Sequence, residues 1–508
     1  MRPPDHVDVL VLGAGLSGIG AAYHLQKYCP TRTFAILEAR ECIGGTWDLF
    51  HYPGVRSDSD MFTLGYSFRP WTAAKSIADG ASILDYIRAT AREHGIDRKI
   101  RFNHRVSRAS WSSEARRWTV EAQQGAGREP ARLTCDFLFV CCGYYSYAEG
   151  YTPSLPGIDR FEGAVVHPQD WTENVAYADK RVVVIGSGAT AVTLVPELAK
   201  KAAHVTMLQR SPTYVVAWPD EDRIANALRR WLPPGTACAL TRWKNVLAGM
   251  YFYRMCKRNP ERAKKMILDG VRAELGPSFD IETHFTPRYD PWNQRLCLAP
   301  NGDFFASIRE GRTSIVTDAI ETFTETGIKL RSGKELDADL VVTATGLNLQ
   351  VLGGAEIEVD GRLADPATTM TYKGALYSDL PNLASVFGYT NASWTLKADL
   401  LCGYVCRLLN YMEKHGYDSC TPRNADPTLE RLPLVDFSSG YFQRSMDKLP
   451  RQGSRRPWQV YQNYVRDIIA LQLAPVDDGV LKFTARPTQP ERSATATPAR
   501  AVQGAGAP

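Results

Sequence analysis

The sequence of 508 residues lacks the cysteine patterns of a disulfide-linked or zinc-binding protein. Its eleven cysteines include no C-x-x-C pair and no paired metal-ligand spacing, and their number is odd. A disulfide framework and a zinc site are therefore not expected, and we predict no metal ligands. This cysteine usage is typical of a reducing compartment, so we expect a cytoplasmic protein.

Long apolar runs and a strong charge imbalance are missing as well. No stretch reaches the roughly 18 apolar residues of a membrane span, and the first strand comes too early for a signal peptide. The net charge is only +5, and no nucleic-acid partner is expected. The densest group of cations is Arg254, Lys257, Arg258, Arg262, Lys264 and Lys265. A solvated helix face is the favoured interpretation, a peripheral membrane contact stays open, and the oligomeric state is not indicated.

A glycine-rich turn near the N-terminus predicts a nucleotide site. Gly13, Gly15 and Gly18 form a G-x-G-x-x-G string directly after the apolar run at residues 7–12, and a helical apolar spacing follows. Such glycines allow the tight turn, the close approach of a pyrophosphate and helix packing. Glu38 ends the next apolar run, where a carboxylate would accept hydrogen bonds from ribose hydroxyls. We predict an adenine dinucleotide with an unphosphorylated ribose here.

A second turn of the same kind occurs in the middle of the chain. It consists of Gly186, Gly188 and Ala191, and its second strand ends in Gln209, Arg210 and Ser211. A guanidinium beside a hydroxyl would bind a phosphate on the ribose, whereas an acid would repel it. The second site is therefore predicted to bind NADP(H). A chain that binds two dinucleotides is expected to pass electrons between them.

The residues after the first turn suggest which group accepts the electrons. A disulfide reductase of this architecture needs two cysteines near the flavin, commonly C-x4-C, but Cys42 stands alone before Gly44-Gly45-Thr46-Trp47. Dioxygen is the obvious alternative acceptor. Between the two turns lies a further string, Phe161-x-Gly163-x-x-x-His167-x-x-x-Trp171.

This string resembles the fingerprint of Baeyer–Villiger monooxygenases, which are FAD- and NADPH-dependent class B flavoprotein monooxygenases. Thr172 stands where the family has Pro or Asp. The resemblance extends over residues 7–412, and segments 44–47, 52–58, 288–305 and 388–400 resemble especially the subgroup of ethionamide-activating monooxygenases. It implies insertion of one oxygen atom from O2 into ketones through a flavin peroxide, giving esters or lactones, and oxidation of thioethers.

The resemblance also implies site residues. The family's active-site arginine corresponds to Arg295 and its partner carboxylate to Asp58, and an arginine suits a peroxide that must stay deprotonated because it keeps its charge. The simpler alternatives are a phosphate clamp for Arg295 and a turn-capping role for Asp58. Gln294 stands where many relatives carry lysine, which leaves more of the phosphate selectivity to Arg210.

Other residues take supporting roles in this interpretation. Gly45, Thr46 and Trp47 are expected beside FAD together with the first glycine turn, Glu38 and Asp58. The motif residues Phe161, Gly163, His167 and Trp171 are expected to couple the two domains, with His167 as a hydrogen-bonded hinge residue rather than an acid or base. Trp231, Trp243, Trp292 and Trp394 belong either to an apolar pocket or, for any single one, more simply to the core.

An acid, an apolar strand and a glycine recur at residues 136–143 and 339–346, so the second unit repeats the first. The predicted fold class is α/β, with two Rossmann-like dinucleotide-binding domains, the NADP domain inserted in the FAD domain, and a helical insertion. The FAD domain is predicted at 1–150 and 350–484 with C-terminal helices, and the NADP domain at 151–349 with helices at about 217–290. Residues 485–508 are expected to be disordered.

Two other functions stay open. One is an N- or S-oxygenating flavin monooxygenase, which needs no deprotonated peroxide. The other is a non-oxygenating flavoprotein, either an NADPH-dependent reductase or a nicotinamide-sensing module. The physiological substrate is not indicated by the sequence.

Overall fold

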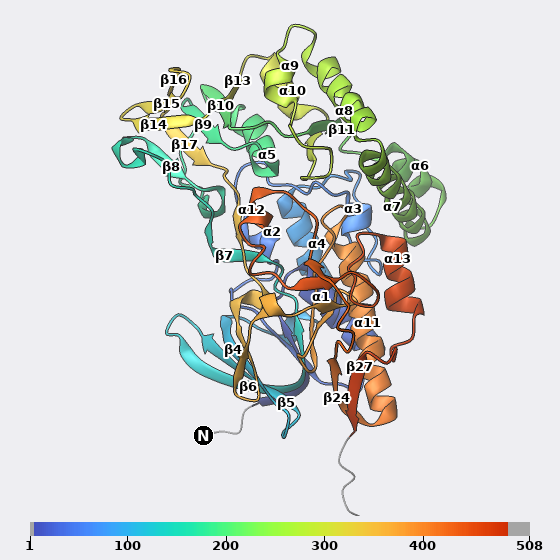
Figure 1. Ribbon diagram of the computed structural model, residues 1–508. Coiled ribbons are helices and arrows are strands. Elements are labelled where there is room, and N and C mark those ends of the chain that lie inside the picture. Colours follow the sequence, from blue (N-terminus) through green and yellow to red (C-terminus); the bar gives the residue numbers. More distant parts are fainter. Residues whose placement is uncertain (1–4, 486–508) are drawn as a thin grey trace, which may run out of the picture.

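The computed structural model of the chain describes residues 5–485. Two separate β-sheets form its framework, one in the lower and one in the upper part of Figure 1, with the C-terminal segments packed along the lower one. The expected α/β architecture with Rossmann-like units is confirmed.

The larger sheet is built around β1 (Asp5–Leu12), which lies parallel between β2 (Phe34–Leu37) and β6 (Glu129–Val140). Residues 9–12 are fully buried, as expected for a parallel strand covered on both faces. Helix α1 (Leu16–Tyr28) packs against α11 (Trp394–His415). The sheet is completed by β3 (Ile100–Arg101), β4 (His104–Ser112), β5 (Arg117–Gln124), β19 (Glu356–Val359), β20 (Arg362–Ala364), β21 (Thr371–Tyr372), β22 (Leu376–Tyr377) and β23 (Leu383–Ser385).

The smaller sheet repeats this plan with five parallel strands in the order β13-β10-β9-β17-β8. Its members are β8 (Ala164–Val166), β9 (Arg181–Ile185), β10 (His204–Gln209), β13 (Thr313–Thr317) and β17 (Leu340–Thr343). Helix α5 (Ala189–Leu198) follows β9 as α1 follows β1. A three-stranded antiparallel sheet adjoins it, formed by β14 (Ile320–Thr324), β15 (Gly327–Leu330) and β16 (Glu335–Asp337).

The chain leaves the first sheet through β7 (Tyr145–Gly150) and returns to it through β18 (Leu347–Leu349). These two strands pair antiparallel, with Leu347 opposite Gly150. The outgoing and returning connections between the two sheets therefore lie side by side, although almost 200 residues separate them in the sequence.

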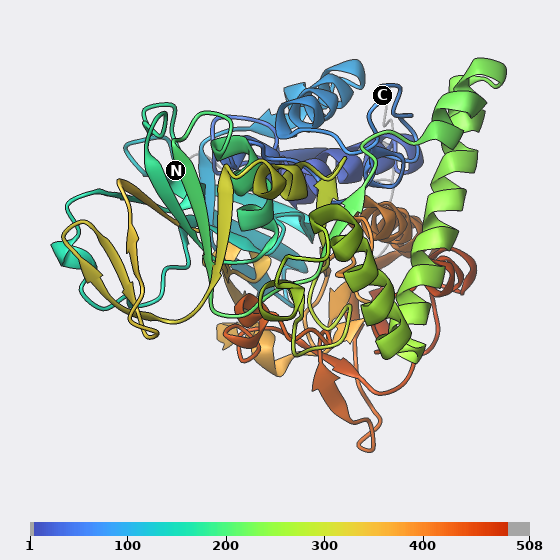
Figure 2. The same cartoon turned by 90° about the horizontal axis from the view of Figure 1, so that it is seen from above.

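Between β11 (Val215–Trp218) and β12 (Cys297–Pro300) most of the chain is helical. This segment consists of α6 (Arg223–Trp231), α7 (Pro234–Arg258), α8 (Pro260–Leu275) and α9 (Ile281–Phe285). In Figure 2 the long helix α7 stands at one side of the molecule. Among the residues that the structure describes, no helix has the length and apolarity needed to cross a membrane.

The remaining elements connect these units. The helices are α2 (Thr46–Leu49), α3 (Met61–Leu64), α4 (Gly80–Glu93), α10 (Asp303–Arg309), α12 (Gly440–Gln443) and α13 (Tyr464–Ile468), which is followed by the π-helical turn Ile469–Leu473. The short 3-10 turns are Asp97–Lys99, Ile158–Arg160, Pro168–Asp170, Leu352–Gly354 and Pro366–Thr368. The strands are β24 (Tyr417–Pro422), β25 (Arg431–Pro433), β26 (Arg451–Gly453) and β27 (Leu481–Ala485). Of the tail predicted to be disordered, Ala485 ends β27 and residues 486–508 lie outside the described part of the chain.

Candidate active site

The first glycine turn has no room for side chains. A Cβ on Gly18 would overlap the carbonyl oxygen of Gly13, and Gly15 faces Gly45 so closely that a Cβ on either would touch the other's backbone. Helix α1 begins after Gly15 without a side-chain cap, so its first N–H groups are free to bind an anion. The turn therefore fits the pyrophosphate of a dinucleotide.

Glu38 lies immediately after β2, at the carboxyl end of the sheet. Its carboxylate accepts hydrogen bonds from the backbone N–H groups of Ala14 (2.7 Å) and Arg40 (2.9 Å). Burial raises the pKa of Glu38, and these two donors offset part of the rise. A carboxylate can accept about four hydrogen bonds, so acceptor capacity is left for ribose hydroxyls.

The segment with Gly45, Thr46 and Trp47 lies against the same turn. The backbone of Gly45 contacts Gly15, and the hydroxyl of Thr46 lies 3.2 Å from that of Tyr147. Trp47 is half-buried and packs on the core under the first sheet. These residues, predicted from separate strings of the sequence, thus come together around one concave turn.

The second turn differs from the first in leaving open space. A Cβ on Gly186 would overlap the carbonyl oxygen of Ala344, whereas a Cβ on Gly188 would have no atom within 4 Å. Helix α5 also begins without a side-chain cap. Ala191 is buried in the core beneath it. The turn is therefore tight on its inner side and open toward a ligand.

Arg210 and Ser211 stand beside this second turn, because the Ser187 hydroxyl donates to the Ser211 carbonyl oxygen at 3.0 Å. Arg210 is exposed, and within the described residues its guanidinium has no ion pair or hydrogen bond. Gln209 points the other way: it is buried, and its amide donates to the His284 carbonyl (2.8 Å) and the Thr317 hydroxyl (2.9 Å). Of these three predicted residues, two face the open side.

The loop at residues 52–58 leaves the first unit and packs on the second. A Cβ on Gly54 would overlap the Glu197 side chain of α5. Arg56 forms an ion pair with Asp303 of α10, with Nη1 and Oδ2 2.5 Å apart. Asp58, at the end of this loop, is thereby held at the junction of the two units.

Arg295, the predicted active-site arginine, also reaches this junction from the segment before β12. No nitrogen of Arg295 lies within ion-pair distance of an Asp58 oxygen, yet the two charges interact: burial raises the pKa of Asp58, and Arg295 and Arg56 offset part of this rise. Burial alone would lower the pKa of Arg295, but nearby phenols and Asp58 raise it above its usual value. Arg295 is therefore charged at every working pH.

The phenols around Arg295 belong to Tyr144, Tyr145 and Tyr441, which sequence reasoning missed. The hydroxyls of Tyr144 and Tyr145 are 3.1 Å apart. Tyr144 and Tyr145 follow Gly143 at the carboxyl end of β6, where ligands of parallel sheets bind, so that position could have suggested them. Tyr441 lies nearly 300 residues further along, and no local signal indicates it.

Aromatic rings extend from this group toward the first glycine turn. The Tyr144 ring lies 5.3 Å from those of both Phe387 and Trp394, measured between centroids. The indole N–H of Trp394 donates to the hydroxyl of Ser17 at 2.7 Å, in the first turn of α1. An apolar wall therefore connects Arg295 to the turn that fits a dinucleotide.

In the motif between the two turns, two aromatic residues are buried in the second unit, and His167 contacts the connections between the units. Phe161 and Trp171 are buried in the cores of the second unit, and a Cβ on Gly163 would overlap the Phe161 ring. His167 instead contacts both connections: its Nε2 lies 3.1 Å from the Gly346 carbonyl oxygen, and a Cβ on Gly150 would overlap its ring.

The hydrogen bonds of His167 fix its protonation state. Its Nδ1 accepts from the backbone N–H of Gln169 at 3.1 Å, so the proton of the neutral ring is on Nε2. Burial lowers the pKa of His167, in agreement with a neutral ring. Gln169, which the sequence did not single out, donates its side-chain amide to the Ser146 carbonyl of β7 at 3.2 Å.

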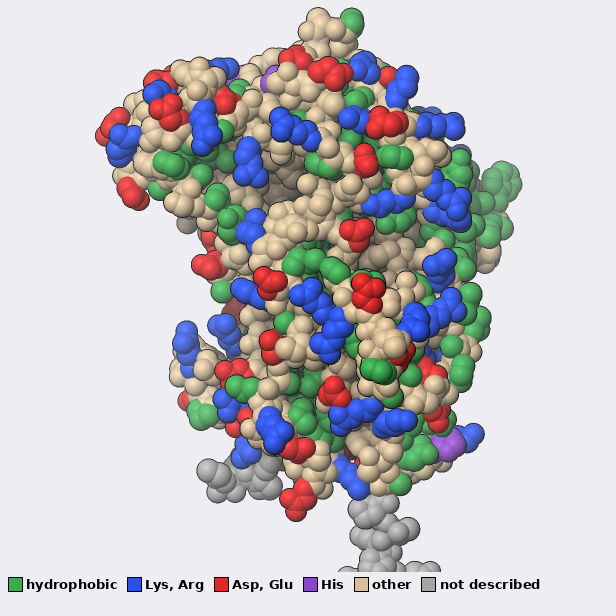
Figure 3. All heavy atoms as spheres, viewed as in Figure 1, with side chains coloured by type: hydrophobic (Ala, Val, Ile, Leu, Met, Phe, Trp, Pro, Cys, Tyr) green, Lys and Arg blue, Asp and Glu red, His purple; other side chains and the backbone are tan. Residues whose placement is uncertain are grey.

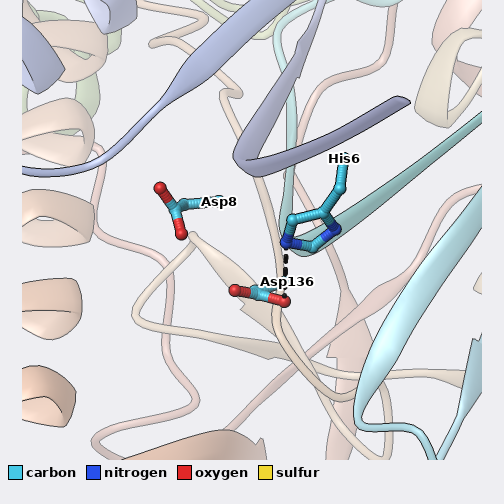
Figure 4. A group of neighbouring side chains, drawn as sticks. All are labelled: His6, Asp8 and Asp136. Carbon is cyan, nitrogen blue, oxygen red and sulfur yellow. Dashed lines mark ion pairs between the residues drawn. The ribbon is translucent and has the colours of Figure 1, made fainter. Parts of the chain in front are cut away.

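One group of described residues has the composition of a metal site, at the amino end of the first sheet (Figure 4). His6 Nε2 lies 3.5 Å from an Asp136 oxygen, and Asp8 accepts from the backbone N–H and hydroxyl of Thr33 at 2.6 and 2.7 Å. Each member has a protein partner of its own, and we assign no metal to it.

Comparison with known proteins identifies two matching family models and several similar proteins. Residues 75–228 match the model of the flavin-binding monooxygenase-like family, and residues 11–75 that of an NAD(P)-binding Rossmann-like domain. The chain is 54% identical to the FAD-containing monooxygenase EthA of Mycobacterium tuberculosis, over 95% of this chain and 99% of EthA. It is 52% identical to the putative FAD-containing monooxygenase MymA of the same organism, over 95% and 98% of the two chains.

Solved structures show the same fold at lower identity. An oxidized steroid monooxygenase bound to NADP superposes with a TM-score of 0.68 at 24% identity, over 82% of this chain and 88% of that one. A cyclohexanone monooxygenase in an open form gives 0.67 at 21% identity, over 82% and 90%.

Proposed function

This chain belongs to the FAD-containing monooxygenase family that includes EthA and MymA, and we propose that it inserts one oxygen atom from O2 into ketones, giving esters or lactones. The observation that carries the proposal is the guanidinium of Arg295, which has no ion pair within residues 5–485 and is held among three phenols and the Asp58 charge where the two glycine-turn units meet. Thioether oxidation is proposed as a second activity of the same site.

FAD and NADP(H) are the cofactors of this enzyme. When bound, FAD that NADPH has reduced activates O2, and one of the two oxygen atoms goes to the substrate. We assign FAD to the first glycine turn with Glu38, Gly45, Thr46, Trp47 and Asp58, and NADP(H) to the second turn with Arg210 and Ser211. The crowded first turn, and the second turn with its open side at Gly188, support these assignments.

Arg295 supplies a permanent positive charge beside the reacting oxygen atoms. A fixed cation in a half-buried site favours the anionic form of activated oxygen, which attacks a carbonyl carbon, and it stabilises the negative charge that develops on the carbonyl oxygen. Asp58 keeps the guanidinium oriented by its own charge without forming a direct ion pair with it. The absence of that pair leaves the donors of Arg295 available to substrate and cofactor.

The neighbourhood of Arg295 favours an apolar substrate. Tyr144, one of the phenols beside Arg295, also lines a pocket together with Phe387, Leu434 and Leu449. Burying an alkyl chain in such a pocket contributes about 0.8 kcal/mol per CH2 group. We propose linear, cyclic or aryl ketones with an apolar body as the substrate class.

Coenzyme choice provides a test of the second site. Arg210 is the exposed, unpaired cation beside the open turn, so Arg210→Ala is expected to raise the KM for NADPH by about tenfold and to leave the KM for NADH unchanged. Arg362→Ala, which removes an exposed arginine on β20 of the other sheet, serves as the matched control. An equal rise for both coenzymes would contradict the phosphate contact.

The experiment that tests the function is a product analysis of purified, FAD-loaded protein with NADPH and air. Linear, cyclic and aryl ketones and a thioether are offered, and products and hydrogen peroxide are quantified by mass spectrometry and a peroxidase assay. Esters or lactones from any ketone are expected. Sulfoxide without ester would instead indicate an S-oxygenating enzyme, and NADPH oxidation that yields only hydrogen peroxide would contradict oxygen insertion.

Domain organisation and compartment complete the proposal. We propose an FAD domain formed by residues 1–150 and 350–484, with the NADP domain at 151–349 inserted in it. The paired strands β7 and β18 support these limits, since each ends or begins at a proposed boundary. All eleven cysteines are free, which suits a reducing cytoplasm.

A further inference from the structure

Helices α6 and α7 carry an apolar face that no part of the described chain covers. Six large side chains on these two helices are at least 43% exposed, with Trp231 at 86% and Tyr251 at 72%. The six are Ile224, Trp231, Leu240, Trp243, Leu247 and Tyr251. Spacings of three and four residues place the last four of them on one face of α7. We call these six residues the insert face.

The opposite side of α7 packs against the rest of the molecule, so α7 is already held in place and the insert face has no further partner to pack against within the described chain. The guanidinium of Arg242 is buried and donates to the carbonyl oxygens of Phe62 (3.1 Å) and Gly65 (2.8 Å), at the end of α3. The exposed face is therefore a fixed outer surface.

The charged side chains on helices α6 and α7 themselves are all of one sign, although Lys244 pairs with Asp222, which precedes α6. From Arg223 to Arg258 the chain contains eight arginines and lysines and no aspartate or glutamate. Arg230, Arg254 and Arg258 are exposed and have no ion pair within the described residues. Figure 3 shows apolar side chains gathered along the edge of the molecule that α6 and α7 form, with basic side chains beside them.

The C-terminal segment extends this surface. Tyr464 at the start of α13 lies 5.7 Å from Trp243 between ring centroids, so α13 runs beside α7. Val465, Ile469 and Leu473 are exposed on α13 and the π-helical turn after it. The apolar surface thus spans two segments far apart in the sequence, which a single poorly packed helix would not explain.

We propose that the insert face docks the enzyme on a membrane surface that contains anionic lipids. A second copy of this chain is a poor occupant, because a symmetric dimer through this face would bring Arg230, Arg254 and Arg258 against the same three arginines of the other copy. An anionic bilayer satisfies both features: its headgroups attract the cations, and its interface accepts apolar side chains and especially Trp and Tyr, which supply three of the six residues. The helices lie on the bilayer and do not cross it.

The test is flotation of the FAD-loaded protein with two kinds of vesicles, pure phosphatidylcholine and phosphatidylcholine with about one third phosphatidylglycerol. Binding is expected to the anionic vesicles, to be at least about tenfold weaker to the neutral ones, and to fall as salt rises above about 0.15 M. Equal binding to both vesicles, or none to either, would overturn the proposal.

Two sets of variants separate the apolar and the charged contribution. Leu247→Ser with Tyr251→Ser is expected to weaken binding to anionic vesicles by at least about tenfold. Arg230→Gln, Arg254→Gln and Arg258→Gln together are expected to weaken it by about 100-fold, which is about fivefold per cation. The matched controls are Leu363→Ser, exposed on β20, and the triple variant Arg105→Gln, Arg331→Gln and Arg362→Gln. Controls that lose as much binding would overturn the proposal.

Tryptophan fluorescence locates the contact. Lipids brominated in their acyl chains should quench the wild-type protein, and Trp231→Phe with Trp243→Phe should abolish most of that quenching. Quenching that persists in this variant would place the contact elsewhere and contradict the proposal. None of these residues belongs to the proposed catalytic site, so NADPH-dependent turnover serves as the check that the variants are folded. The vesicle experiments do not depend on oxygen insertion into ketones, so failure of that proposed function would leave the docking test unaffected.

Discussion

At the scale of single residues, Arg295 combines two properties that seldom occur together. Its charge is fixed, because phenols and a carboxylate raise its pKa against the effect of burial, and its donors have no partner among the described residues. A half-buried charge without a partner costs free energy unless a ligand pairs with it. Such a residue is expected to contribute to binding and catalysis more than to stability.

We therefore expect Arg295→Ala to lower kcat for ketone oxygenation by about 100-fold or more, since it removes the permanent cation that we propose to lie beside the reacting atoms. The flavin absorbance of the purified variant should be unchanged, because Arg295 lies outside the first glycine turn. The measurement is ester formation per enzyme, with Arg331→Ala as the control. A variant that still forms ester at the wild-type rate would show that another group stabilises the charge.

His167 makes a prediction about pH. Burial lowers its pKa in the folded protein, so below its ordinary value of 6.5 the unfolded chain takes up a proton that the folded ring does not. The corresponding stability is complete above that value and is lost as pH falls through the window below it. Between about pH 7.5 and pH 5.5, the melting temperature of wild type should fall by about 1 °C more than that of His167→Gln. An equal fall in both proteins would mean that His167 does not titrate in this window.

The candidate site residues that the sequence indicates are those with local signals. Glu38 and Arg210 stand at a fixed position after a glycine turn, and Arg295 belongs to a matched segment of the family. Tyr441 could not be found, because only the folded chain brings α12 beside the end of β6. Gln209 was expected beside NADPH from its position alone, but the alternation of side chains along β10 points it into the interior.

At the scale of elements, the two glycine turns differ in the space that they leave. Gly18→Ala should prevent FAD loading, because its Cβ would overlap the Gly13 carbonyl oxygen. Gly188→Ala meets no protein atom, so we expect normal folding and FAD content with a KM for NADPH raised about tenfold, by intrusion on the pyrophosphate. Flavin absorbance, melting temperature and steady-state kinetics measure these effects. A Gly188→Ala enzyme with an unchanged KM would contradict the second site.

The C-terminal helix α13 is fastened to α11 by a buried ion pair. Lys397 Nζ lies 2.5 Å from an oxygen of Asp467, and the Tyr389 hydroxyl donates to the other oxygen at 2.6 Å. Asp467→Ala leaves a buried lysine without its counter-ion, so we expect a loss of about 3–5 kcal/mol in the free energy of unfolding. Asp269→Ala, which removes an exposed ion pair on α8, should cost less than about 1 kcal/mol.

Chemical denaturation of the FAD-loaded variants measures these losses. The double variant Lys397→Met with Asp467→Leu should recover much of the stability, because no unpaired charge remains buried. If the double variant is as unstable as Asp467→Ala, packing rather than the charge explains the loss.

The elements predicted from sequence are those whose pattern is strong within one segment. Strand β1 and helix α1 are read from an apolar run followed by a helical spacing, and β9 and α5 repeat them. The short strands β19 to β23, two to four residues each, carry too few positions for a periodicity to show. For the cations of α7 and α8 the sequence favours a solvated face, because it does not tell which helix face remains without a partner.

At the scale of the whole molecule, the two sheets are joined by paired connections with one histidine between them. The carbonyl oxygen of Gly346 accepts from His167 and from the backbone N–H of Tyr151. A movement of one unit relative to the other changes the course of both connections, and His167 contacts both of them. We propose that His167 couples the position of the NADP unit to the reaction at Arg295, with Phe161, Gly163 and Trp171 anchoring the motif.

This coupling predicts a non-additive pair of substitutions. Gly150→Ala pushes its Cβ into the His167 ring and should displace the connection, so we expect product formed per NADPH consumed to fall by roughly tenfold, with the difference appearing as hydrogen peroxide. His167→Ala should show a similar loss by removing the bond to Gly346. In the His167→Ala background, however, Gly150→Ala should add almost nothing, because the ring that it would strike is absent. The measurements are oxygen uptake, peroxide release and ester yield of all four proteins. Additive losses would mean that the two residues act separately. If both single variants form as much product per NADPH as the wild type, His167 has no role beyond stability.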